Sequence, residues 1–459
     1  MRTKPSFSIN ILLCASIFSS LGLASHAIGQ VVNENIKIIA SDGDSNDRFG
    51  YAINIDNGII AVGAQHDDLR AGSVYLYDAS TGQQIAKLIA EDAAAEDEFG
   101  TSLALADGII AIGARWDDDN GNATGSAYLF DADPLSPSFG EQLAKLNADD
   151  ANAGDLFGTS IAIENGIVAI GAQWDDDNGF NSGSVYLFDA STGMQLNKII
   201  PEDGQESAFF GSSIAISDGI VAIGANSDSN GAGSVYLYQV SSGSLLFKLQ
   251  AINGEGPDSF GTSIDFDNNI VAVGAPLNND HDNASGAAYL FDATTGTQLA
   301  EILSDTPTSY EFFGHSIAIQ NNIVAIGTRD LEFVDSIGTG AAYLFDVNTA
   351  TQINTLIPSD GIELNLFGNS IAINNGTVVV GAILDNENGV DSGSAYIFDL
   401  PNTNCPADLN GDSMTNFFDV SNFLSAFASL NPIADFNNDG LFNFFDISTF
   451  LEVFSVGCP

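Results

Sequence analysis

The sequence predicts an all-β fold for residues 28–400, a closed seven-bladed β-propeller of four-stranded blades, followed by a small α-helical calcium-binding domain at residues 405–459. A Phe-Gly pair recurs seven times with a mean spacing of 53 residues, and the repeats contain short strand-like segments. Two twelve-residue loops rich in oxygen side chains follow a polar linker at 401–404. Repeats of this length are typical of propellers and related arrays, and oxygen-rich loops are typical of calcium sites.

Residues 1–27 are expected to be a secretory signal peptide. A basic start precedes an apolar stretch at residues 11–23, and Ser25-His26-Ala27 matches a small-x-small cleavage site. We expect cleavage after Ala27, with Gly29 as the alternative. The apolar stretch is too short for a membrane span, and no other segment is suited to one. The protein is therefore predicted to be secreted, and extracellular or attached to a cell surface.

The chain is strongly acidic, with 60 acidic and 11 basic residues and a formal net charge of −49. Removal of residues 1–27 leaves 9 basic and 60 acidic residues, a formal charge of −51. Such a surface repels nucleic acid and anionic membranes, so neither is expected as a partner. The remaining cysteines, Cys405 and Cys458, are expected to form one disulfide because an exported chain meets an oxidising environment.

The seven Phe-Gly pairs begin seven similar units. They stand at Phe49-Gly50, Phe99-Gly100, Phe157-Gly158, Phe210-Gly211, Phe260-Gly261, Phe313-Gly314 and Phe367-Gly368. In the third unit, residues 160–163 and 167–172 are predicted strands joined by the turn Glu164-Asn165-Gly166, and two further strands follow at 183–189 and 195–200. Both faces of the first two strands are apolar, as expected when each sheet packs between two neighbours.

The two ends of this array complement each other. Residues 36–40 match the fourth strand of a unit although they precede the first Phe-Gly pair, and the seventh unit ends at residue 400 after three strands. The N-terminal strand is therefore predicted to complete the seventh blade. This closure removes an exposed sheet edge, which an open array would not require.

The units resemble the FG-GAP repeat family, which includes the head of the integrin α-subunit. The Phe-Gly pair, a Gly-Ala pair about 14 residues later (as at Gly63-Ala64 and Gly171-Ala172) and a Gly-x-x-Tyr strand carry the resemblance over residues 35–400. The sixth unit departs slightly, with Gly327-Thr328. The resemblance implies a seven-bladed propeller whose usual role is adhesion to a protein or glycan, without catalysis.

Two loops between second and third strands are candidate calcium sites. They read DDDNG at 117–121 and 175–179, and their possible ligands are Asp117, Asp119, Asp175 and Asp177. Calcium loops of FG-GAP proteins alternate acids with spacers, whereas these acids are contiguous, so solvated turns are the alternative. Trp116 and Trp174 precede the loops at equivalent positions. They are interpreted either as sugar-stacking residues or as loop anchors.

The C-terminal domain contains two predicted calcium loops, 408–419 and 435–446, offset by 27 residues. Positions 1, 3, 5, 9 and 12 of each loop hold oxygen side chains, and position 7 offers its backbone carbonyl. The predicted ligands are Asp408, Asn410, Asp412, Met414, Asn416 and Asp419 in the first loop, and Asp435, Asn437, Asp439, Leu441, Asn443 and Asp446 in the second. Gly440 stands where the second loop turns sharply, whereas the first loop has Ser413 there.

An amphipathic helix is predicted after each loop. Loop followed by helix, with Asp at loop position 12, resembles the dockerin family over residues 405–459. This resemblance implies docking to a cohesin-like protein or surface scaffold, and a disulfide between Cys405 and Cys458 would join the ends of the domain. Loop positions 10 and 11, which help to choose the partner in dockerins, hold Phe417, Phe418, Phe444 and Phe445. Packing in the small core is the alternative for some of these four rings.

Catalysis finds little support in the sequence. No GxSxG, HExxH or P-loop motif occurs, and His66, His281 and His315 stand at unrelated positions of their repeats. The abundant carboxylates single out no glycosidase pair. The sequence therefore predicts a non-catalytic binding or adhesion protein. Two alternatives stay open: an extracellular polysaccharide-degrading enzyme or its accessory subunit, and a structural wall or surface protein.

Overall fold

The computed structural model describes residues 30–254, 256–280, 282–305, 307–329, 340–361, 365–400, 407, 409, 417–429, 431–437 and 440–456. The expected signal peptide, the linker at 401–404 and both cysteines of the predicted disulfide lie outside the described residues. Within the described residues, no helix is long and apolar enough to cross a membrane.

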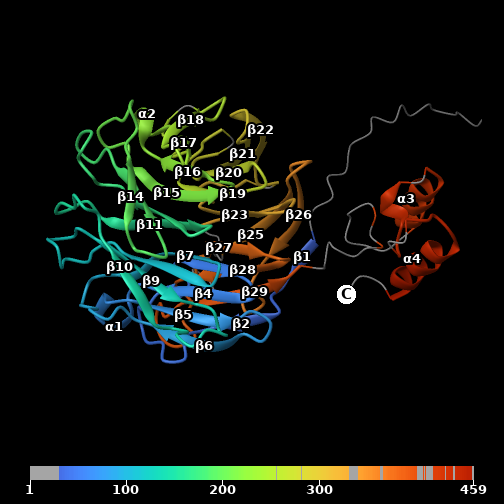
Figure 1. The fold of residues 1–459 in the computed structure, drawn as a ribbon, viewed down its shortest axis with the longest axis horizontal. Coiled ribbons are helices and arrows are strands. Elements are labelled where there is room, and N and C mark those ends of the chain that lie inside the picture. The colour runs from blue at the N-terminus through green and yellow to red at the C-terminus, as the bar shows by residue number, and fades with distance from the viewer. Residues whose placement is uncertain are drawn as a thin grey trace, which may run out of the picture.

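Seven sheets follow one another along the chain, and each is a blade (Figure 1). The first four blades contain β3 (Ile53–Asp56), β4 (Ile59–Ala64), β5 (Ser73–Asp78) and β6 (Gln83–Leu88); β7 (Phe99–Ala106), β8 (Ile109–Ala114), β9 (Ser126–Asp131) and β10 (Gln142–Leu146); β11 (Phe157–Glu164), β12 (Ile167–Ala172), β13 (Ser184–Asp189) and β14 (Gln195–Ile199); and β15 (Phe210–Ser217), β16 (Ile220–Ala225), β17 (Ser234–Gln239) and β18 (Ser244–Leu249).

The last three blades repeat this order. They contain β19 (Ser263–Asp267), β20 (Ile270–Ala275), β21 (Ala287–Asp292) and β22 (Thr297–Ile302); β23 (Ser316–Gln320), β24 (Ile323–Gly327), β25 (Ala342–Asp346) and β26 (Thr351–Leu356); and β27 (Phe367–Asn374), β28 (Thr377–Ala382) and β29 (Ser394–Asp399). The fourth strand of the seventh blade comes from the N-terminus and is described below. The predicted seven-bladed propeller of four-stranded blades is therefore confirmed.

The glycines of the repeat mark points of close approach between blades. Gly158 has φ +90°, and a Cβ there would lie 2.5 Å from the carbonyl oxygen of Ser126 in the preceding blade. A Cβ at Gly171 would lie 2.2 Å from the carbonyl oxygen of Gly211 in the following blade. Beside Gly158, the buried Phe157 ring packs edge-on against Tyr186 and Phe188 of its own blade. The Phe-Gly pair thus combines an aromatic anchor with a residue that has no side chain to obstruct the neighbour.

The ring closes as predicted. Strand β2 (Ile36–Ile38) pairs antiparallel with β29, with Lys37 opposite Tyr396, and so supplies the fourth strand of the seventh blade. It ends two residues before the predicted limit at residue 40. An additional strand that the repeat pattern does not indicate, β1 (Gln30–Val32), pairs parallel with β26 and gives the sixth blade a fifth strand. The N-terminal segment therefore joins two blades and protects two sheet edges.

The first strands of all seven blades surround a central channel of about 260 Å³. Asp265 is the charged residue in its lining, and its carboxylate accepts hydrogen bonds from the backbone amides of Ile319 (2.7 Å) and Phe266 (2.8 Å). Loops between second and third strands lie on one face of the ring, together with the connections that lead into each first strand. We call this the loop face. It includes the short turns α1 (Asp67–Arg70) and α2 (Asp228–Gly231), on the left in Figure 1.

The C-terminal domain contains α3 (Phe417–Ala428), the 3-10 turn η1 (Pro432–Ala434) and α4 (Phe444–Val456). Its small core is aromatic: the rings of Phe423 and Phe450 stack with centroids 4.1 Å apart, and Phe436 packs edge-on against both. The predicted helix after each loop is confirmed. This core is far smaller than that of the propeller, so metal and a disulfide remain the expected additional stabilisers.

Candidate functional site

Five blades share a cluster that we call the lysine clamp, in which a lysine on the fourth strand contacts a buried aspartate in the loop between the second and third strands. In blade two, Lys145 Nζ lies 2.6 Å from Asp92, 2.9 Å from Asp117 and 2.7 Å from Asp119. Blade three repeats this arrangement. The five lysine–aspartate pairs are Lys37–Asp385, Lys87–Asp67, Lys145–Asp117, Lys198–Asp175 and Lys248–Asp228.

A tyrosine of the third strand completes each clamp. In blade two the Tyr128 hydroxyl donates a 2.6 Å hydrogen bond to Asp117, whose side chain is 2 % exposed. Lys145 Nζ also lies 5.2 Å from the Tyr128 ring centroid, a cation–π distance. Burial tends to lower the pKa of Lys145, but the hydrogen bonds from its ammonium to Asp119, Asp92 and Asp117 outweigh burial and raise the pKa above its usual value. The lysine therefore stays charged.

The clamps bear directly on the predicted calcium loops. Asp117 and Asp119 do converge, and their carboxylates lie with that of Asp92 within 4.8 Å of one another. However, the Lys145 ammonium contacts all three carboxylates, so a calcium ion there would compete with an attached cation. In blade three, Lys198 contacts Asp175 (2.9 Å) and Asp177 (2.5 Å) in the same way. Calcium in these loops stays a prediction.

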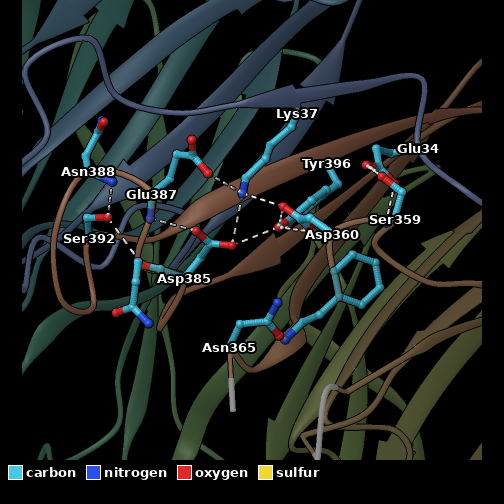
Figure 2. A network of polar contacts seen from close by, with 12 residues as sticks. Glu34, Lys37, Ser359, Asp360, Asn365, Asp385, Glu387, Asn388, Ser392 and Tyr396 are labelled. Atoms are coloured by element: carbon cyan, nitrogen blue, oxygen red, sulfur yellow. Dashed lines mark hydrogen bonds and ion pairs between the residues drawn. The ribbon is translucent and has the colours of Figure 1, made fainter. Parts of the chain in front are cut away.

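Sequence reasoning missed the lysines and the aspartates that follow the preceding fourth strand. A signal was present, because a lysine recurs in the fourth-strand pattern of five units. The seventh-blade clamp (Figure 2) shows what this residue does. Lys37 from β2 contacts Asp360 (2.6 Å), Asp385 (3.2 Å) and Glu387 (3.1 Å), while the Tyr396 hydroxyl donates to Asp385 at 2.9 Å. Ring closure is thus fixed by side chains as well as by the β2–β29 ladder.

A second cluster lies on the loop face between blades one and two. The Glu98 carboxylate, 1 % exposed, accepts hydrogen bonds from the guanidinium of Arg70 and from Arg115 Nε (3.0 Å). His66 Nε2 lies 3.5 Å from the same carboxylate. Burial acts to raise the pKa of Glu98, but His66, Arg70 and Arg115 together lower it to about 2. Glu98 is therefore a permanent anion that orients the cationic side chains around it.

The two tryptophans singled out in the sequence meet next to this cluster. The Trp116 and Trp174 rings lie edge to face, with centroids 6.2 Å apart. Trp116 is half-buried, whereas Trp174 is 36 % exposed. Their backbone amides donate to the carbonyl oxygens of Asp97 and Asp155, respectively. The pair therefore anchors two loops and also leaves an aromatic surface open to solvent.

The two described histidines, His66 and His315, belong to different blades and do not meet in one site. His66 belongs to the Glu98 cluster, and His281 lies outside the described residues. His315 follows a Phe-Gly pair in blade six, where burial and the charge of Arg329 lower the pKa of its imidazole to about 4. His315 is therefore neutral near pH 7.

The structure describes part of the predicted calcium loops. Asp419 and Asp446, at position 12 of each loop, lie in the first turns of α3 and α4 and are fully buried. Asp446 accepts hydrogen bonds from the backbone amides of Asn437 and Asn443, and Asp435 accepts one from that of Gly440. Gly440 has φ +76°, the left-handed conformation expected at a sharp turn. Asp408, Asn410, Asp412, Met414, Asn416 and Asp439 lie outside the described residues.

The structure describes the side chains of two of the four predicted partner-binding residues. Phe444 and Phe445 are 72 % and 67 % exposed at the start of α4, so neither ring belongs to the core. The side chains of Phe417 and Phe418 lie outside the description. Two exposed aromatic rings next to a predicted calcium loop form a surface suited to protein binding.

Comparison with known proteins addresses the propeller. The family model described as "FG-GAP repeat" matches residues 32–77, 83–130, 141–188, 194–238, 245–291 and 350–398, which together make up more than half of the chain. These matches run from the fourth strand of one blade to the third strand of the next, and no match covers 292–349, which includes the departure at Gly327-Thr328. No curated protein matches the chain. With the Phe-Gly anchors and the seven-bladed ring in place, the chain belongs to the FG-GAP repeat family.

Proposed function

We propose that this protein is a secreted or surface-attached, non-catalytic binding and adhesion protein. Its propeller recognises a protein or glycan, and its C-terminal calcium-binding, dockerin-like domain docks it to a cohesin-like scaffold. The observation that carries the binding role is the loop face, where charged and aromatic side chains are held in place by a rigid ring. Family membership supports the same role, since FG-GAP propellers are typically binding folds.

The Glu98 cluster and the lysine clamps of the loop face favour binding over catalysis. A general acid or base works best with a pKa near the operating pH. Although burial acts to raise the pKa of Glu98, its contacts with His66, Arg70 and Arg115 hold that pKa far below this range. In each clamp the lysine ammonium compensates the charge of the buried aspartate that it contacts. These groups position neighbours and present charge, which suits recognition.

Docking through the C-terminal domain is supported by the arrangement of its described residues. Buried carboxylates stand at position 12 of both predicted loops, and the two loops are similar in sequence at an offset of 27 residues. Exposed Phe444 and Phe445 adjoin the second loop. Carboxylate and carbonyl oxygens gathered in a short loop are the ligands that calcium prefers, so a calcium ion would stabilise this arrangement.

Two binding measurements on the protein comprising residues 28–459 test the proposal. Capture by an immobilised panel of cohesin modules is expected in calcium and is lost in EDTA. Incubation with polysaccharides and proteins is expected to give saturable binding without new reducing ends. Capture that ignores calcium would contradict the docking role, and release of sugars would favour the polysaccharide-degrading alternative.

A further inference from the structure

The nine basic residues that follow residue 27 occupy two kinds of site. All five lysines lie in clamps, where two or three carboxylates surround each ammonium. All four arginines stand in connections of the loop face: Arg48, Arg70, Arg115 and Arg329. In a chain dominated by acids, the positive charge outside the clamps is therefore concentrated on one face of the propeller.

Two of these arginines share a single carboxylate. Among the described residues, the ion pairs of Arg70 and Arg115 both end on Glu98, so two guanidiniums share one carboxylate. A guanidinium has five N–H donors, and one carboxylate cannot use the donors of two. The Arg70 side chain is 46 % exposed and that of Arg115 is 25 % exposed. Both guanidiniums therefore retain donors for a second carboxylate.

An aromatic surface adjoins these donors. Trp116 follows Arg115 directly and packs against Trp174 of the next blade, so the group spans the loops of blades one, two and three. We call Arg70, Arg115, Trp116 and Trp174 the arginine–tryptophan patch. Glu98 lies beneath it and holds the guanidiniums in place. The patch combines guanidinium donors held by Glu98 with partly exposed indole rings on neighbouring loops.

We propose that the arginine–tryptophan patch binds a uronic-acid residue of an acidic polysaccharide, with Arg70 and Arg115 pairing with the sugar carboxylate and Trp174 stacking on a sugar ring. This inference rests on the proposed function and names the glycan class for the propeller. Arginine binds carboxylates through paired N–H donors of fixed geometry. Lysine lacks this planar fork and presents a point charge instead.

A uronic acid fits the patch better than an acidic peptide. It carries an apolar C–H face and a carboxylate on one rigid ring, so little conformational entropy is lost when both are bound. Glutamate and aspartate side chains must lose rotamer freedom to reach the same donors. The overall negative charge opposes a polyanionic polysaccharide as it opposes nucleic acid, so binding depends on the short paired contacts at the patch. Salt screens the longer-range repulsion beyond about 8 Å, and affinity is therefore expected to rise when salt is increased from low to physiological concentration.

The test uses residues 28–459 in 0.15 M salt, with polygalacturonate, methyl-esterified pectin, neutral β-glucan and poly-glutamate as probes in affinity electrophoresis and calorimetry. The variants are Arg70→Gln and Trp174→Ala. Arg329→Gln, an arginine of the same face in blade six, and Met194→Ala, an exposed residue in the turn between β13 and β14, are the matched controls. Melting curves establish that each variant is folded.

We expect polygalacturonate to bind and the esterified and neutral polymers to bind at least about tenfold more weakly. Each patch variant is expected to lose about tenfold in affinity at an unchanged melting temperature, as for the loss of one charged contact, while both controls bind like the parent. Equal binding by patch variants would move the glycan site elsewhere. Preference for poly-glutamate would replace the glycan by an acidic peptide. Binding of neutral glycans alone would overturn this inference but keep the proposed function, whereas failure of all four probes would overturn both this inference and glycan recognition by the propeller.

Discussion

Lys37 Nζ lies 3.2 Å from the carboxylate of Asp385, although 348 positions separate the two residues. Lys37 belongs to the N-terminal strand β2, and Asp385 belongs to the loop between β28 and β29 of the last blade. This ion pair can therefore form only in the closed ring. The Asp385 side chain is fully buried, so its charge depends on Lys37 and on the hydroxyl of Tyr396 for compensation.

Lys37→Met is expected to lower the free energy of unfolding by about 3 kcal/mol, because loss of one partner leaves a buried charge uncompensated. Urea unfolding of residues 28–459 measures this change. The double variant Lys37→Met/Asp385→Asn removes the stranded charge and is expected to recover most of the loss. A single variant as stable as the parent would show that the clamp contributes nothing to closure.

Stability should depend on pH in opposite directions through two carboxyl groups. Burial in the channel raises the pKa of Asp265 to about 6 from an ordinary value of 3.8, so the folded state binds this proton more tightly than the unfolded chain does. Stability linked to Asp265 is therefore gained as pH falls from about 7 to about 4. Glu98 has a pKa lowered to about 2, so its contribution is present above its ordinary value of 4.5 and is lost as pH falls toward 2.

We therefore expect a melting-temperature maximum near pH 4 to 5, measured by thermal unfolding across buffers of matched ionic strength. Burial also raises the pKa of Asp97 and Asp155 to about 6. Asp265→Asn should therefore reduce the slope between pH 7 and pH 4 by its own share and leave the acid side of the curve unchanged. An unchanged slope in this variant would assign the effect to other carboxyl groups.

Calcium and lysine compete for the same oxygens in blade two. Lys145→Gln removes the ammonium from Asp92, Asp117 and Asp119. The variant should therefore bind calcium at this loop at least about tenfold more tightly, which is the effect expected for one buried charge pair. Calorimetry of residues 28–400 compares the two affinities, and Asp117→Asn in the same background is the control. Equal calcium affinity with and without Lys145 would show that the clamp does not control this site.

Calcium should order the C-terminal domain. Each predicted loop carries three formal negative charges that repel one another in the absence of metal, so metal binding adds to folding free energy. In a chain whose propeller is β-structured, circular dichroism at 222 nm mainly follows α3 and α4. EDTA under reducing conditions is expected to lower this signal, and an Asp419→Ala/Asp446→Ala variant should start from the lowered value. Unchanged helicity after complete calcium removal would contradict the prediction.

The exposed phenylalanines should carry docking. Replacing Phe444 and Phe445 by Ala is expected to weaken capture by a cohesin-like partner modestly, since the first loop offers a similar pair, Phe417 and Phe418. Replacing both pairs should abolish capture, because truncation of an interface anchor costs on the order of 2 kcal/mol or more. Calcium binding, followed by calorimetry, should persist in both variants. Full-strength capture by the fourfold variant would place the docking surface elsewhere.

The repeat pattern was sufficient for the fold because its causes are local or periodic. The Phe-Gly pair seen at Phe157-Gly158 occurs in all seven blades. Each pair places an aromatic ring and a glycine backbone at the same position between neighbouring blades. The N-terminal strand at residues 36–38 could be predicted for the same reason, since its sequence repeats the fourth-strand pattern. Strand β1 could not be predicted in this way, because its parallel pairing with β26 does not belong to the repeated pattern.

The alternation and spacing of residues within each unit were enough to predict the seven blades, their strand order and closure by the N-terminal strand. Which charged side chains meet depends on how the blades pack. Asp117 and Asp119 share an ammonium with Asp92, and Arg70 and Arg115 share Glu98, across blade boundaries that sequence spacing does not describe. The physical reason is that side-chain electrostatics act over a few ångströms in space, and packing of one blade against the next brings those atoms within that range.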